Sequence, residues 1–124
     1  MARLLVVDDS ALSRRISRRI LEEAGHAVSE AAEGMTALER YAVDRPDVVL
    51  LDVTMAEMDG FEVLRQLRAM DPTARVVMAT ADVQASSRAL AEAGGAVGFV
   101  GKPFAADALL RAVDAALAGE GAAP

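Results

Sequence analysis

Residues 4–10 read Leu-Leu-Val-Val-Asp-Asp-Ser: four aliphatic residues end abruptly in two acids and a hydroxyl. An almost wholly apolar run of this length is typical of a strand that is covered on both faces. Residues 48–52 repeat the pattern as Val-Val-Leu-Leu-Asp, and residues 76–80 repeat it as Val-Val-Met-Ala-Thr. These runs predict the central strands of a parallel sheet, with a polar side chain at the carboxyl end of each.

Short apolar runs and longer segments of helical period alternate along the whole chain. Strands are predicted at Leu4–Val7, Ala27–Glu30, Val48–Leu51, Val76–Ala79 and Val97–Val100. Helices are expected at about 11–24, 35–44, 60–70, 84–93 and 105–118, with Ser10 as the N-cap of the first. Strict alternation predicts an α/β fold, a five-stranded parallel sheet with five helices on both faces, because each crossover is right-handed. The flavodoxin-like strand order 2-1-3-4-5 suits this length and places the ligand site at the carboxyl ends of strands one and three.

The composition excludes most kinds of catalytic and binding chemistry. The 124 residues contain no cysteine and one histidine, which excludes thiol chemistry and multi-histidine metal sites. No tryptophan and a single tyrosine leave little for the stacking of bases or flavins. A net charge of −6 argues against a nucleic-acid partner. Because no signal peptide or membrane span is visible, we expect a cytoplasmic protein without membrane contact. One domain is expected over residues 1–119, followed by a flexible tail at 120–124.

Groups that can handle a cation or a phosphate stand at four of the five predicted strand ends. Asp8 and Asp9 follow the first strand, Asp52 the third, Thr80 the fourth and Lys102 the fifth. Neighbouring carboxylates repel one another by roughly 3 kcal/mol per pair at about 5 Å and an effective dielectric near 20, unless a cation neutralises them. Oxygen ligands alone favour a hard ion such as Mg²⁺. A carboxylate beside Mg²⁺ can attack an activated phosphoryl group, and Thr80 and Lys102 can then receive the added charge.

The basic residues divide into one lysine and a set of arginines. Lys102 is the single lysine, and a compact ammonium on a flexible stem suits contact with a phosphate. The first predicted helix carries two arginine stripes at i,i+4 spacing, Arg14 with Arg18 and Arg15 with Arg19. We expect these stripes to be a solvated face, with docking of a kinase or phosphotransfer partner as the second interpretation.

Taken in order and with their spacings, these motifs resemble the response-regulator receiver domains of two-component signalling. The residues that carry the resemblance are Asp8-Asp9, Leu51-Asp52-Val53-Thr54-Met55 leading to Met58-Asp59-Gly60, Thr80-Ala81 and Gly101-Lys102-Pro103-Phe104. The resemblance covers essentially the whole chain. Its single-domain length and the stretch Thr54–Met58 are most similar to the chemotaxis type.

The resemblance implies a phosphoacceptor and a metal site. Asp52 would accept the phosphoryl group of a histidine kinase's phosphohistidine. Mg²⁺ would be held by Asp9 directly, by Asp8 mainly through water, by Asp52, and by the backbone carbonyl of Thr54.

The resemblance also implies how the signal would leave the site. Thr80 would hydrogen-bond a phosphoryl oxygen, Lys102 would form an ion pair with it, and Phe99 would be the aromatic switch that follows Thr80. The Lys102–Pro103 peptide bond is expected to be cis. Positions 54 and 82 tune dephosphorylation in the family, and the acid Asp82 could either orient or repel an attacking water.

These implications describe a signalling switch rather than an enzyme. The expected partners are a histidine kinase or phosphotransfer protein and a downstream target such as a flagellar motor switch, with the chain acting as a monomer. No output domain is expected after the last helix, so a phosphate sink or a relay intermediate stays open. The rival enzyme is a Mg²⁺-dependent phosphohydrolase of the haloacid-dehalogenase type, which needs Asp-x-Asp where this chain has Asp8-Asp9-Ser10. A flavodoxin-like cofactor protein would need a hydroxyl-rich phosphate loop, which the sequence lacks.

Overall fold

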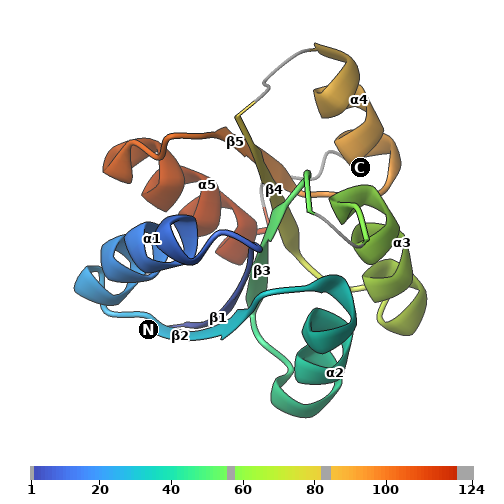
Figure 1. Cartoon of the computed structure of the whole chain (residues 1–124), viewed down its shortest axis with the longest axis horizontal. Helices are drawn as coiled ribbons and strands as arrows, with labels where there is room; N and C mark the ends of the chain where they lie inside the picture. Colours follow the sequence, from blue (N-terminus) through green and yellow to red (C-terminus); the bar gives the residue numbers. More distant parts are fainter. Residues whose placement is uncertain (1, 56–57, 82–84, 120–124) are drawn as a thin grey trace.

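Parallel strands form a central sheet in this computed structural model, which describes residues 2–55, 58–81 and 85–119 (Figure 1). The strands are β1 (Arg3–Val7), β2 (Ala27–Ala31), β3 (Val48–Asp52), β4 (Val76–Thr80) and β5 (Gly98–Gly101). The helices are α1 (Ala11–Glu23), α2 (Gly34–Asp44), α3 (Gly60–Met70), α4 (Ala85–Ala93) and α5 (Ala106–Leu117). The strand order is β2-β1-β3-β4-β5, so the predicted fold class and topology are confirmed.

Helices cover both faces of the sheet, with α1 and α5 on one side and α2, α3 and α4 on the other (Figure 1). Side chains alternate between the two faces along β1: Leu4 and Val6 join the core beneath α1 and α5, and Leu5 and Val7 join the other core. All residues of β3 and β4 are buried. Two covered faces explain why these strands consist of continuous apolar runs.

Strands β3 and β4 end one residue later than the apolar pattern predicts. Asp52 pairs with Ala79, and Thr80 pairs with Gly101, in the parallel ladders. The backbone hydrogen bonds of the sheet continue past the last apolar residue, because ladder pairing does not depend on side-chain polarity. Asp52 and Thr80 are therefore held by the sheet instead of lying in a loop. The other bounds differ from the predicted ones by no more than one residue.

Helix α1 begins at the predicted cap, directly after the two acids that follow β1. The Ser10 side-chain oxygen accepts a hydrogen bond from the Ser13 amide at 3.2 Å. Beyond the helix, Gly25 has a φ of 95°, which allows the chain to turn towards β2 at little cost. The cap fixes the point at which α1 begins, directly after the short connection that contains Asp8 and Asp9.

Two sequence-based expectations fall on parts of the chain outside the described residues. They are the flexible tail at 120–124 and the tuning role of Asp82. Within the described ranges, none of the helices combines the length and the apolarity that a bilayer span requires.

Candidate functional site

Three carboxylates meet at the carboxyl end of the sheet. Asp8 and Asp9 follow β1, Asp52 ends the neighbouring β3, and each offers an oxygen within 4.8 Å of the other two. Asp8 and Asp52 are buried, with 3% and 6% of their surface exposed, and Asp9 is exposed. The pairing of β1 with β3 brings these residues together, as predicted for the switch point of this topology.

The ammonium group of Lys102 lies between the two buried carboxylates. Its Nζ donates to Asp8 Oδ2 at 2.6 Å and lies 3.3 Å from Asp52 Oδ1. Lys102 follows β5, and its backbone N–H donates to the Thr80 carbonyl at 2.8 Å, which anchors the base of the side chain to β4. The single lysine of the chain is therefore the cation that partly neutralises the acidic cluster.

Burial and a like charge raise the pKa of Asp52 to about 6. Removal of the carboxylate from water is the larger cause, and the charge of Asp8 is the second; Lys102 and the backbone N–H of Thr54 oppose both. At neutral pH the carboxylate is still mostly ionised. Asp52 is thus a buried, partly neutralised carboxylate held on a rigid strand.

The other predicted site residues lie around this centre. Thr80 is buried at the end of β4, and Thr54 is exposed in the segment after Asp52. Phe99 lies in β5, opposite Met78 of β4, and is half-buried against the core. The Arg88 guanidinium carbon is 5.0 Å from the centre of the Phe99 ring. The Lys102–Pro103 peptide bond is cis, the isomer that the resemblance implied.

A largely apolar hollow of about 350 Å³ opens beside the acidic cluster. Lys102 is part of its wall. The other lining residues come from α1 and its cap, from the end of β4 and from the segment that leads into α5: Ser10, Leu12, Ser13, Ile16, Ala81, Pro103 and Phe104. Leu12 is 64% exposed and Ile16 is 42% exposed, so two large aliphatic side chains face solvent next to the charged centre.

Comparison with known proteins assigns the chain to a family. The response regulator receiver domain model matches residues 4–114 of the chain. The chain belongs to the response regulator receiver domain family. A relative, the chemotaxis protein CheY of Listeria monocytogenes, is 41% identical over 117 residues, which are 94% of this chain and 98% of that protein. The response regulator MprA of Mycobacterium ulcerans is 42% identical and matches 93% of this chain, but only 50% of its own length is covered.

Solved structures of other receiver domains agree with this assignment. The chemotaxis protein CheY4 of Vibrio cholerae has a TM-score of 0.90 at 34% identity, over 94% of this chain and 99% of that one. A LuxR-family two-component response regulator of Aurantimonas has a TM-score of 0.91 at 35% identity, over 96% of this chain and 86% of that one. Receiver domains are signalling modules of two-component systems that bind Mg²⁺ at an aspartate cluster, and Asp8, Asp9 and Asp52 are grouped at the end of the sheet in this chain.

One arginine of this receiver domain departs from the expected solvated face. Arg14 Nη1 donates to the Asp8 carbonyl at 2.7 Å, and Arg14 Nε pairs with Glu30 at 2.9 Å, so only 18% of its side chain is exposed. The expectation was wrong for Arg14 because its partner lies in β2, 16 residues away, where helical spacing gives no signal. Arg19, by contrast, is 79% exposed and pairs with Glu23 at the i,i+4 spacing.

Gly60 has a role that cap and turn chemistry did not reveal. A Cβ atom at this position would lie 2.2 Å from the Asp52 carbonyl oxygen and 2.8 Å from the Val53 Cα. The Gly60 N–H donates to the Val53 carbonyl at 2.8 Å. The absence of a side chain lets the start of α3 pack directly against the backbone of the central aspartate.

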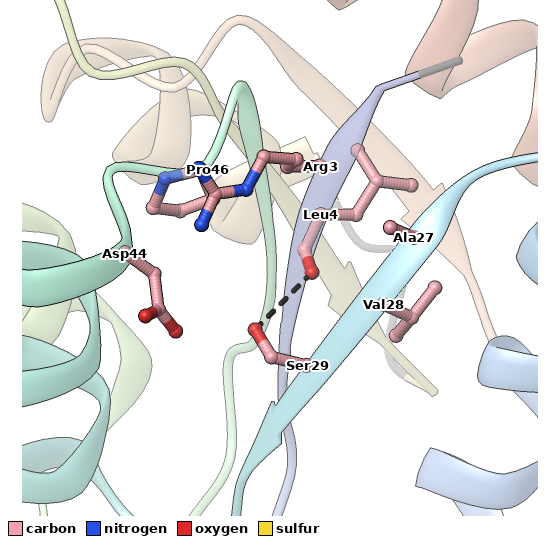
Figure 2. A pocket seen from close by; sticks show the side chains of 7 residues that line it. All are labelled: Arg3, Leu4, Ala27, Val28, Ser29, Asp44 and Pro46. Carbon is pink, nitrogen blue, oxygen red and sulfur yellow. Dashed lines mark hydrogen bonds between the residues drawn. The ribbon is translucent and has the colours of Figure 1, made fainter.

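A second hollow, of about 210 Å³, lies at the opposite, amino-terminal end of the strands (Figure 2). It is lined by residues of β1 and β2 together with Asp44 and Pro46, and the Ser29 hydroxyl donates to the Leu4 carbonyl at 3.4 Å. Its lining contains one carboxylate and one guanidinium, so it lacks the charge concentration of the acidic cluster.

Replacement of Asp52 is expected to stabilise the fold at neutral pH in metal-free buffer. The folded-state pKa of about 6 exceeds the roughly 3.9 of an unfolded aspartate, so stability falls as pH rises between these two values. Above the higher value the penalty is about 2–3 kcal/mol, because one pKa unit corresponds to about 1.4 kcal/mol. Asp52→Asn removes this penalty, and its advantage should be small at about pH 4 and large at about pH 7.

Urea denaturation in the presence of a chelator measures this difference. Asp114→Asn, an exposed change on α5, is the control and should leave the free energy of unfolding almost unchanged. An Asp52→Asn advantage that is the same at both pH values would contradict the raised pKa.

Proposed function

We propose that the chain is a phosphorylation-dependent switch that accepts a phosphoryl group on Asp52. One observation carries the proposal: the buried Asp52 carboxylate lies beside two further carboxylates and 3.3 Å from the Lys102 ammonium. Structural ion pairs rarely place three acids around one lysine, because the uncompensated charge costs stability. A divalent cation bound among the three carboxylates would remove that cost, and it would also offset the negative charge that a phosphoryl group brings to Asp52.

The donor set fits Mg²⁺. Three carboxylates and one ammonium leave a charge of −2, and the donors are oxygens, as a hard divalent ion requires. Asp8, Asp9 and Asp52 would hold the ion, and we retain the Thr54 carbonyl as the proposed fourth protein ligand. When bound, Mg²⁺ supplies positive charge that stabilises the negative charge growing on the transferred phosphoryl oxygens.

The phosphoryl transfer requires little of the protein beyond position and charge. An oxygen of the ionised Asp52 carboxylate attacks the phosphorus of a phosphohistidine, a new O–P bond forms, and the P–N bond breaks with its electron pair passing to the imidazole nitrogen. Lys102 would pair with the transferred group, a role supported by the 3.3 Å between its Nζ and Asp52 Oδ1. Thr80, at the end of the adjacent strand, would donate its hydroxyl to a second phosphoryl oxygen.

Output would pass from Thr80 to Phe99. The two residues lie in neighbouring strands, and the half-buried Phe99 ring would change its exposure when Thr80 moves towards a phosphoryl group. The surface altered in this way is formed by α4, β5 and α5. We propose that a downstream protein binds this surface, with the flagellar motor switch as the first target to test.

The phosphodonor would dock on α1. The exposed Leu12 and Ile16 line an apolar hollow whose wall includes Lys102, so a helix seated there would bring its histidine towards Asp52. Apolar side chains exposed beside a functional site are typical of a protein-binding surface. The partner is therefore a histidine kinase or phosphotransfer protein that presents an apolar helical face.

Chemotaxis is the pathway that the comparisons favour. The relatives named chemotaxis protein CheY match this chain over 94–98% of their own length, which is the size of an isolated receiver domain. We propose a monomeric receiver unit over residues 1–119 with residues 120–124 as a tail, acting through non-covalent partners.

Incubation with acetyl phosphate and Mg²⁺ should add about 80 Da, the mass of one HPO₃ group, to the intact protein. Asp52→Asn should abolish the gain, because an amide is not a nucleophile for phosphorus. A chelator should abolish it in the unmodified chain. Intact-protein mass spectrometry measures all three outcomes.

Asp114→Asn, which removes an exposed carboxylate far along α5, serves as the matched control and should retain the mass gain. If the gain persisted in Asp52→Asn, or never appeared in the unmodified chain with Mg²⁺, the proposed function would be wrong.

Leu12→Asp should slow phosphorylation by a protein donor more than tenfold, since a charge in an apolar docking surface costs on the order of 2 kcal/mol. The reaction with acetyl phosphate should stay near that of the unmodified chain, because Leu12 does not contribute to the acidic cluster. Transfer from a purified chemotaxis histidine kinase, labelled with radioactive ATP, gives the protein-donor rate.

Val43→Asp is the control: Val43 is 81% exposed on α2, outside the hollow. Equal rates for Leu12→Asp and Val43→Asp with the kinase would contradict docking on α1.

A further inference from the structure

The backbone N–H and the backbone carbonyl of Asp8 are both linked to β2 by hydrogen bonds, the carbonyl through Arg14. Its N–H donates to the Ala31 carbonyl at 3.1 Å. Its carbonyl accepts from Arg14 Nη1 at 2.7 Å, and Arg14 Nε in turn pairs with Glu30 Oε1 at 2.9 Å. Glu30 and Ala31 are consecutive residues at the end of β2, so one short stretch of the edge strand holds the amide directly and the carbonyl through Arg14.

Glu30 is itself firmly held. Arg18 Nη1 lies 2.6 Å from Glu30 Oε2, so two arginines one helical turn apart grip the two oxygens of one carboxylate. These hydrogen bonds, that from Arg18 foremost, lower the pKa of Glu30. The ionised Glu30 carboxylate therefore holds the Arg14 guanidinium through Nε, while Nη1 of the same group contacts the Asp8 carbonyl.

The carbonyl that Arg14 contacts belongs to the peptide that joins Asp8 to Asp9. Because a peptide unit is planar, fixing its oxygen also fixes the direction in which the Asp9 residue continues. Asp9 is the exposed member of the acidic cluster and follows the end of the ladder, so the sheet alone does not set its direction. Arg14 supplies that constraint from α1.

A guanidinium beside a cation site carries an electrostatic cost. Its positive charge repels a divalent ion, and the ion pair with Glu30 offsets much of that repulsion. The planar fork of arginine can contact Glu30 with Nε and Asp8 with Nη1 at once, whereas a lysine offers one nitrogen for both. Arg14 therefore holds the Asp8 carbonyl in place, and its pair with Glu30 adds little net positive charge beside the cation site.

We propose that Arg14, anchored by Glu30, is a positioning residue for Mg²⁺: it presets the Asp8–Asp9 peptide so that the carboxylates are arranged before the ion binds. The inference rests on the proposed Mg²⁺ site. The inference predicts that loss of Arg14 weakens Mg²⁺ binding. Simple electrostatics predicts the opposite, because removal of a nearby positive charge should by itself tighten the binding of a cation.

The test is a Mg²⁺ titration of the full chain, without any phosphodonor, followed by amide chemical shifts in NMR spectra. Arg14→Gln should raise the Mg²⁺ dissociation constant by about tenfold, the usual effect of losing a group that orients metal ligands. Arg14→Lys, which keeps the charge but not the fork, should raise it similarly. Arg19→Gln and Arg19→Lys, changes at an exposed i,i+4 pair of the same helix, should leave it unchanged.

Two further readouts separate the possible failures. Urea denaturation in chelator reports any general loss of stability, which a purely structural Arg14 would show without a change in Mg²⁺ affinity. An Arg14→Gln affinity equal to or tighter than that of the unmodified chain, with Arg14→Lys unchanged, would overturn the inference. Absence of Mg²⁺-dependent shifts in the unmodified chain would instead refute the proposed function. If Arg14→Gln does not fold, Arg14→Lys decides.

Discussion

Repulsion between the buried carboxylates of Asp8 and Asp52 is the constraint on which the rest of this structure depends. The two side chains end adjacent strands, and neither can move away, because β1 and β3 are paired along their length. Lys102 offsets part of this repulsion, because its ammonium group forms ion pairs with both carboxylates. Together with burial, which is the larger cause, the remaining repulsion raises the pKa of Asp52 to about 6. The fold thus carries an electrostatic cost at one point, which a bound cation can relieve and where that cation can also offset the charge of a phosphoryl group.

Local sequence features were sufficient for the architecture and for the centre of the site. Apolar runs flanked by caps and turns define the strands and helices, and parallel topology forces the strand ends together. The sequence therefore predicts that Asp8, Asp52, Thr80 and Lys102 lie at one edge of the sheet. Strand length was less accessible, since Asp52 and Thr80 belong to the ladders through backbone pairing that side-chain polarity does not reveal.

Long-range contacts were the part that the sequence could not supply. Arg14 and Glu30 are separated by a helix, a turn and most of a strand, and no periodicity links them. Likewise, Gly60 was interpretable as part of a turn, but only the structure shows how closely the α3 start approaches the Asp52 carbonyl. Both contacts reach the backbone of the aspartates from the neighbouring helices, Arg14 from α1 and Gly60 from the start of α3. They suggest that the site is shaped by its supporting backbone as much as by the charged groups themselves.

The central claim is that Asp52, the aspartates beside it and Lys102 form one site for a phosphoryl group and Mg²⁺. A crystal structure of the chain with Mg²⁺ and beryllofluoride, a phosphoryl mimic, tests it most directly. The account predicts the mimic on an Asp52 oxygen, the ion ligated by the aspartate cluster, and Lys102 Nζ paired with the mimic. A mimic bound elsewhere, or an ion that Asp9 and Asp52 do not contact, would contradict it.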